Sequence, residues 1–154
     1  MGLCQSSQIV QDTEVLQLYV AHYGAEGLRG AWHWSFLLMR DGNSGDSTAY
    51  QIRGSEQTYA YEGPDRQVDV ARSRSFQGKV HVGSIPADRL HDFEQALNDV
   101  PVIRGTRTGW NCQNWIMDAL ARLHAARFPV EVINHTELLQ ELETAKRELA
   151  LEGA

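Results

Sequence analysis

Cys112 is the residue whose type and position best suit covalent chemistry in this chain. It follows the glycine-containing loop 105–109 and Asn111, and it stands at the predicted start of a helix. The free backbone N–H groups of a helix start favour a thiolate, so we expect a lowered pKa for Cys112 and an N–H that faces a developing oxyanion. The alternative is a small buried cysteine, because Cys112 also falls on the apolar stripe of that helix.

A nucleophilic thiol needs a base, and His33 is the histidine that the pattern favours. It lies within a predicted strand between Trp32 and Trp34, where burying an imidazole without a polar partner is costly. His22 and His81 also fall in predicted strands and are alternatives. The remaining histidines fall on helix faces or in loops, where we expect them to be solvated: His91, His124 and His135.

The next predicted strand supplies a group that can orient the imidazole. Gln51 lies in its middle, and its amide can hold His33 by one hydrogen bond without carrying a charge. The alternative for Gln51 is a polar residue on the exposed face of a half-buried strand.

Residues close to this pair are candidates for contacting a substrate. Arg104 and Arg107 flank the loop before the cysteine, where they either meet an anionic group or are simply solvated. We take Arg107, Trp34 and Asn111 as candidate substrate-binding residues.

The elements that must position these residues follow from the hydrophobic pattern. Stretches rich in β-branched and aromatic residues, bounded by turns, predict strands at residues 15–23, 31–40, 48–53, 57–61 and 75–82. Apolar residues at helical spacing predict helices at residues 86–98, 111–126 and 136–151. The expected fold class is α+β, with a small antiparallel sheet followed by packed helices.

Length and composition limit the class of protein. The 154 residues suffice for one domain, and we expect a flexible segment at 1–13 and a single folded domain at 14–154. The chain has 20 acidic and 14 basic residues, a net charge of −6, which argues against a nucleic-acid partner. Only two cysteines occur, which excludes a disulfide scaffold and a four-cysteine zinc site. We expect no metal and no organic cofactor.

The order of these motifs resembles that of the circularly permuted NlpC/P60 papain-like group. Its branches include the lecithin retinol acyltransferase-like acyltransferases and the PPPDE-type peptidases. The resemblance rests on His33 in a strand, Gln51 on the next strand, and the Asn111–Cys112 pair that opens a helix, and it covers about residues 14–126. In that group the histidine precedes the cysteine, as it does here.

The resemblance implies a permuted papain-like fold in which Cys112 is the nucleophile, His33 the general base and Gln51 the orienting residue. The implied reaction is hydrolysis of an amide or ester bond through a thioester on Cys112, with a peptide or another acyl- or amide-bearing molecule as substrate. Many members have a second histidine where Gln51 stands. The acyltransferase and PPPDE branches often have a histidine two residues after the cysteine, where this chain has Asn114.

Two other functions remain open. A lipid-directed acyltransferase or thioesterase would use the same residues with an apolar acyl pocket. A catalytically silent binding module would keep the fold without turnover, and the departures at Gln51 and Asn114 favour that alternative.

The two ends of the chain carry signals of their own. The N-terminal residues fit the N-myristoylation pattern, with Gly2 as acceptor and Cys4 available for a second acyl chain, which would give stable membrane association. The alternative is that Gly2 is incidental and Cys4 an exposed thiol. Residues 1–12 are polar, so no signal peptide is predicted and we expect a cytoplasmic location. The predicted helix 136–151 either packs on its own domain or pairs with a second copy or a partner.

Overall fold

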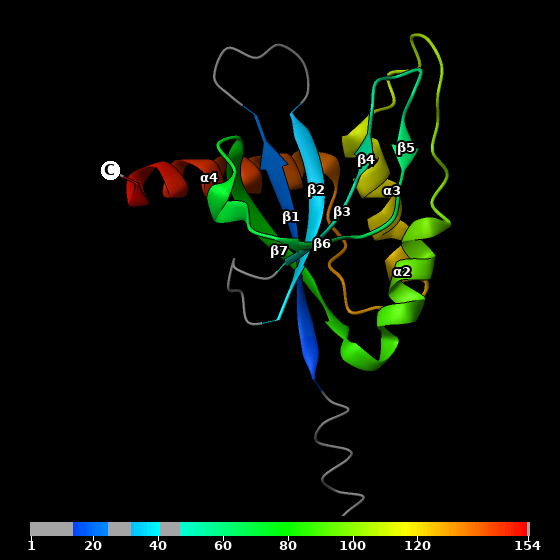
Figure 1. Ribbon diagram of the computed structural model, residues 1–154, viewed down its shortest axis with the longest axis horizontal. Coiled ribbons are helices and arrows are strands. Elements are labelled where there is room, and N and C mark those ends of the chain that lie inside the picture. Colours follow the sequence, from blue (N-terminus) through cyan, green and yellow to red (C-terminus); the bar gives the residue numbers. More distant parts are fainter. Residues whose placement is uncertain (1–13, 25–31, 41–46, 154) are drawn as a thin grey trace, which may run out of the picture.

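The computed structural model describes residues 14–24, 32–40 and 47–153, and its fold is α+β, as predicted (Figure 1). One antiparallel sheet has the strand order β6–β3–β2–β1–β7. Its strands are β1 (Val15–Tyr23), β2 (His33–Met39), β3 (Ser47–Tyr50), β6 (Asp65–Val68) and β7 (Phe76–Pro86). A separate hairpin joins β4 (Ile52–Arg53) to β5 (Ala60–Tyr61).

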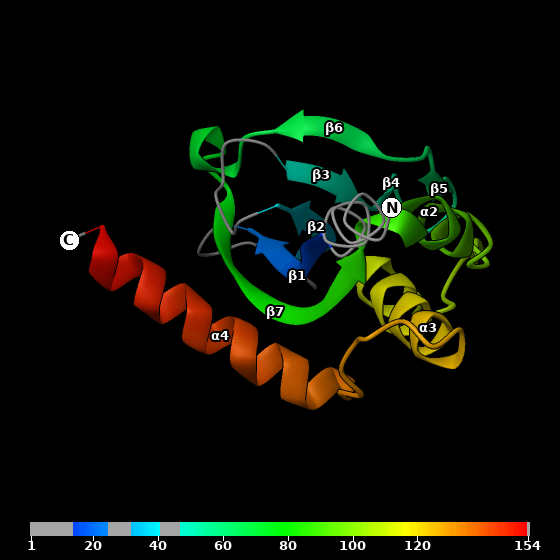
Figure 2. The same ribbon diagram turned by 90° about the horizontal axis from the view of Figure 1, so that it is seen from below.

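The helices follow the sheet in the sequence. They are α2 (Leu90–Asn98), α3 (Cys112–Ala125) and α4 (His135–Glu152). Short 3-10 turns occur at Val70–Arg72 and at Ala87–Arg89. Figure 2 shows α4 running along β7, while α2 and α3 pack together near the other end of the sheet. The bounds of α3 and α4 agree with the prediction to within one residue.

Three details of the predicted strands are wrong. The expected strand 48–53 breaks at Gln51, because β4 leaves the main sheet to pair with β5. The expected strand 57–61 is reduced to Ala60–Tyr61. The strand expected at 75–82 is longer than predicted, since β7 runs through Gly83 to Pro86. Gly83 is needed for packing, since a Cβ there would lie 2.7 Å from the carbonyl oxygen of Pro129.

The sheet separates two apolar clusters. The larger lies between the sheet and the helices, and it includes Trp34 and Phe36 of β2 together with Trp115 of α3. The smaller lies on the opposite face and includes Leu37 and Met39. Side chains alternate along a strand, so His33 belongs to the same face as Leu37.

The apolar side of α4 is used within the protein itself. Leu138 and Leu142 are fully buried in the larger cluster. Where α4 crosses β7, Gly78 permits the approach, because a Cβ there would lie 3.1 Å from the backbone of Ala145. Among the described residues, no helix is both long and apolar enough to cross a bilayer.

Candidate active site

Cys112 is the first residue of α3, and a capping box fixes it there. The Asn111 side chain accepts a hydrogen bond from the Gln113 backbone N–H at 2.9 Å, and the Asn114 side chain accepts one from the Asn111 N–H at 2.9 Å. These bonds satisfy N–H groups that a helix start leaves open. Both asparagine side chains are therefore engaged in holding the helix start, and a substrate-binding role for Asn111 stays a prediction.

The thiol of Cys112 lies against the backbone of β2. Its Sγ donates to the Trp32 carbonyl oxygen at 3.8 Å, and the Trp34 backbone N–H points to the sulfur. The backbone groups of alternate residues in a strand point to the same edge, so those of Trp32 and Trp34 share one edge of β2. The sulfur contacts both, and it therefore lies at this edge, level with the residue between them, His33.

The strand pairing explains why no neighbouring strand covers this edge of β2. On one side of β2, strand β1 continues as far as the Tyr23–His33 pair. On the other side, β3 ends at the Phe36–Tyr50 pair. The start of α3 occupies the edge beyond that pair, where the Gln113 side chain also donates to the Trp32 carbonyl oxygen at 2.8 Å.

His33 is held by the predicted partner. Its Nε2 lies 2.5 Å from Gln51 Oε1, and its ring stacks on Tyr23 with 5.9 Å between centroids. Because the amide oxygen accepts, Nε2 carries the proton and Nδ1 presents a lone pair. Within the described residues, Nδ1 makes no hydrogen bond. The predicted His33–Gln51 hydrogen bond is thus present.

Burial is the main influence on the pKa of both the His33 imidazole and the Cys112 thiol. It lowers the pKa of His33, and Arg53 lowers it further, while the bond to Gln51 partly opposes these effects. Burial also raises the pKa of the Cys112 thiol, because the side chain is only 8% exposed. The N–H groups of Trp34, Gln113 and Cys112 offset this only in part. The expected lowered thiol pKa is therefore wrong, since desolvation outweighs the helix start.

The structure brings the two candidate residues to neighbouring positions without bonding them. In the described part of the chain, no hydrogen bond joins Cys112 to His33. The sulfur lies at the edge of β2, whereas the imidazole lies on the face that carries Tyr23. Their pairing as nucleophile and base stays a prediction.

A hollow of about 530 Å³ opens on the His33 side of the sheet. His33, Gln51 and Arg53 line it, and the Arg53 guanidinium pairs with Asp65 at 3.2 Å. Tyr23 also lines the hollow, and burial raises its pKa to about 12, so it stays protonated at neutral pH. Polar groups thus converge on this side, although Cys112 itself does not line the hollow.

The other residues predicted to contact a substrate are placed differently. Trp34 is fully buried and stacks on His135, so it offers no surface to a substrate, and that prediction is wrong. Arg104 is not simply solvated, because its Nε donates to the Tyr59 carbonyl oxygen at 2.6 Å. Arg107 is exposed and has a left-handed φ of 62°. A contact between Arg107 and an anionic group stays a prediction.

Three of the other five histidines have local partners. His22 is buried and donates to the Gln77 carbonyl oxygen at 3.0 Å. The exposed ring of His81 lies 2.7 Å from the Gln17 amide oxygen. His135 was expected to be solvated, but its Nε2 lies 2.8 Å from the amide oxygen of Gln113.

Gln113 was missed by the sequence reasoning. Its side chain joins His135 to the backbone carbonyl beside Cys112. Nothing in the spacing of residues signals this contact, because it depends on where α4 starts relative to β2.

Two further expectations concern other parts of the chain. Gly2 and Cys4 lie outside the described residues. Within the part that the structure describes, no group of three or more histidine, cysteine, aspartate or glutamate side chains is arranged to hold a metal ion.

The fold and this geometry define an α+β protein with a buried thiol against the middle strand of an antiparallel sheet. Residues 18–128 match the family described as "Family of unknown function (DUF6540)", and the chain belongs to that family. The matched span includes both His33 and Cys112. No curated protein and no solved structure matches the chain.

Proposed function

We propose that the protein is a cysteine-dependent hydrolase of amide or ester bonds, with Cys112 as nucleophile and His33 as general base. One observation carries the proposal. The Cys112 sulfur lies against the β2 backbone that flanks His33, while Gln51 holds Nε2 of the imidazole and Nδ1 makes no hydrogen bond among the described residues. A base oriented by a third group beside a nucleophile is the arrangement that acyl transfer needs.

The resting charges favour transfer of the proton during attack. Because its pKa is lowered, His33 is neutral at pH 7 and can accept a proton on Nδ1. Because its pKa is raised, the Cys112 thiol keeps its proton until a substrate binds. Sulfur then attacks the carbonyl carbon as its proton passes to Nδ1.

The remaining steps return the protein to its starting state. His33 gives the proton to the leaving amine or alcohol, and the acyl group remains on Cys112 as a thioester. A water molecule, deprotonated by His33, then attacks the thioester carbonyl, and the thiol is regenerated as the acid departs. The backbone N–H groups of Trp34, Gln113 and Cys112 act on the sulfur, so they are the candidate donors for the oxyanion.

The finer fold assignment belongs to the same proposal. In a permuted papain-like enzyme, the strand that carries the catalytic histidine comes before the helix that begins with the catalytic cysteine, and this chain has the same order. The antiparallel sheet, and the α3 start that lies against β2, support this assignment.

The test is formation of an acyl-enzyme from a small activated ester, p-nitrophenyl acetate, followed by nitrophenol release and by intact mass. We expect an acetyl group on Cys112 in the wild type and none in the peptide that contains position 112 in Cys112→Ala. His33→Gln should slow acylation by about 10²-fold or more, the usual contribution of a general base. The matched control is His81→Gln, an exposed strand histidine, which should acylate at the wild-type rate.

A second function has its own support. The thiol is only 8% exposed and does not line the hollow beside His33, which favours a catalytically silent binding module on the same fold. Equal and slow acetylation of Cys112 in the wild type and in His33→Gln would contradict the hydrolase proposal and favour this alternative.

A further inference from the structure

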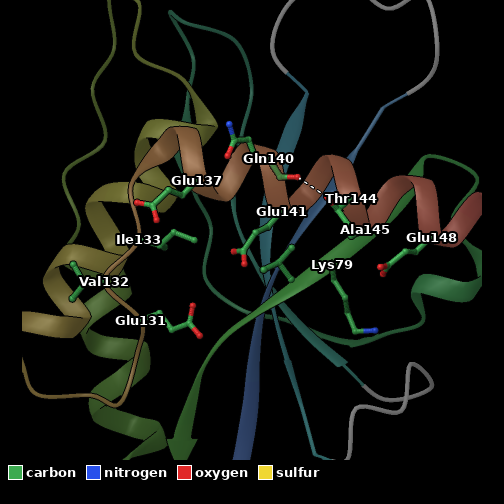
Figure 3. Close-up of a pocket in the computed structure, with 11 residues that line it drawn as sticks. Lys79, Glu131, Val132, Ile133, Glu137, Gln140, Glu141, Thr144, Ala145 and Glu148 are labelled. Atoms are coloured by element: carbon green, nitrogen blue, oxygen red, sulfur yellow. Dashed lines mark hydrogen bonds between the residues drawn. The ribbon is translucent and has the colours of Figure 1, made fainter.

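A groove runs between α4 and β7, away from the candidate active site (Figure 3). Its volume is about 560 Å³. Lys79 and Val80 of β7 form one wall, the segment 131–133 closes one end, and α4 forms the other wall. Val132 in that segment is 79% exposed, so an apolar side chain stands open at this end.

The groove carries a strong negative charge. Glu131, Glu137, Glu141 and Glu148 line it, and in the described residues none of them forms an ion pair. Lys79 is the basic residue of the lining, but its ammonium lies 5.0 Å from the centre of the Tyr19 ring. In the described residues Lys79 forms no ion pair, and its single positive charge leaves the lining with an excess of negative charge.

The carboxylates are spaced regularly along the helix. Figure 3 shows Glu137, Glu141 and Glu148 in turn along α4. Intervals of four and seven residues place them on one stripe, about 6 Å and about 10 Å apart along the axis. In an extended peptide, side chains on one face recur about every 6.6 Å. An extended chain with a basic residue at every second position therefore matches the first interval.

The other wall suits an extended occupant too. Among the described residues β7 is the last strand of the sheet, and segment 129–131 bonds only to its Val82–Ser84 part. Where that segment leaves the strand, the groove begins at Lys79 and Val80. A partner lying here meets a strand edge on one side and the carboxylates on the other.

We propose that this groove binds an extended, lysine- or arginine-rich segment of a partner protein. Charge complementarity selects this occupant over a second copy of the chain. A second copy would bring the same acidic stripe, and the chain as a whole has a net charge of −6. The proposal is independent of chemistry at Cys112.

The test uses a short fluorescent peptide in which lysine alternates with threonine, measured by anisotropy at low salt and at physiological salt. We expect saturable binding to the wild type that weakens as salt increases. The double variant Glu141→Gln with Glu148→Gln should bind about fivefold more weakly, because two surface charge pairs are lost. Glu137 is left intact, since its side chain accepts from the Asn134 N–H that caps α4.

The matched control is Glu143→Gln with Glu152→Gln, which removes the same charge from α4 outside the groove lining. It should retain affinity to within about twofold if the contact is local. Amide NMR shifts on peptide addition should map to β7 and α4. Absence of saturable binding, or equal weakening in both double variants, overturns the proposal. Dimerisation of the wild type that Glu141→Gln with Glu148→Gln abolishes also overturns it, in favour of a second copy.

Discussion

The Cys112 sulfur lies 3.8 Å from the Trp32 carbonyl oxygen, at the edge of β2 that β3 leaves uncovered. The Trp34 backbone lowers the pKa of the same thiol, against the larger effect of burial. The thiol thus occupies the backbone positions that a neighbouring strand would otherwise fill, and its reactivity depends on this setting.

Alkylation of Cys112 should be slow at neutral pH. Burial raises the pKa of the thiol above its ordinary value of 9.0 and also limits access to it. We expect iodoacetamide to label Cys112 more slowly than free cysteine at pH 7, with a rate that still increases beyond about pH 9. Mass spectrometry of the Cys112 peptide measures this separately from Cys4. A rate that levels off below about pH 8 would contradict the raised pKa.

Substitution of Gln51 should shift the titration of His33 in a predictable direction. The hydrogen bond from Gln51 raises the pKa of His33 against the larger effect of burial. Gln51→Leu should therefore lower this pKa further, and Gln51→Glu should raise it, because a carboxylate stabilises the imidazolium. NMR titration of the His33 ring protons reads out both shifts.

The matched control for this pair is Gln17→Leu, which removes the amide bound to His81. It should leave the His33 titration unchanged. If both Gln51 variants titrate as the wild type does, the short contact between Gln51 and His33 does not persist in solution.

Stability should decrease as the pH falls through the histidine range. Burial is the main cause that lowers the pKa of both His22 and His33. Below about pH 6.5 the unfolded chain binds protons that the folded state does not, so unfolding is favoured until the lowered pKa values are reached. The free energy of unfolding should fall by at most about 1.4 kcal/mol per pH unit for each histidine.

Urea unfolding between about pH 7.5 and pH 5.5 measures this slope. His22→Gln keeps a donor for the Gln77 carbonyl and should flatten the slope. His81→Gln, at an exposed position, should leave it unchanged. A wild-type slope of zero would contradict a lowered pKa at His22 and His33.

Loss of the α3 cap should weaken both the helix start and the setting of the thiol. Asn111→Ala removes the acceptor for the Gln113 N–H, at a cost of about 1 kcal/mol in the free energy of unfolding, and Asn111→Asp should restore most of it. Asn134→Ala, at the equivalent cap of α4, should cost a similar amount. Only the Asn111→Ala change should alter the alkylation rate of Cys112, and an equal change in Asn134→Ala would contradict a local role.

The elements that the sequence predicted best have strong local signals. β1, α3 and α4 each combine a regular apolar pattern with clear ends, such as Asn111 before α3 and Asn134 before α4. β6 was missed because three of its four residues are exposed and polar, so no apolar alternation marks it. The local apolar pattern therefore predicts strands and helices that bury one face, and it misses elements such as β6 whose side chains are mostly exposed.

The candidate site was predictable in part for the same reason. The contact of His33 with Gln51 was expected from consecutive predicted strands, and the structure contains it although Gln51 lies at the break between β3 and β4. The raised pKa of Cys112 and the contact of Gln113 with His135 depend on how α3 and α4 pack against β2. Neither property belongs to a single segment, so the spacing of residues along the chain does not reveal them.

The cover that α3 provides for β2 has a consequence for the whole molecule. The backbone groups of Trp32 and Trp34 meet Cys112 and Gln113 where β3 has ended. An uncovered strand edge is a template for another chain. Partial unfolding of the first turn of α3 would therefore expose an aggregation-prone edge in the middle of the sheet. The residue proposed to perform the chemistry therefore also covers backbone groups with which another chain could otherwise pair.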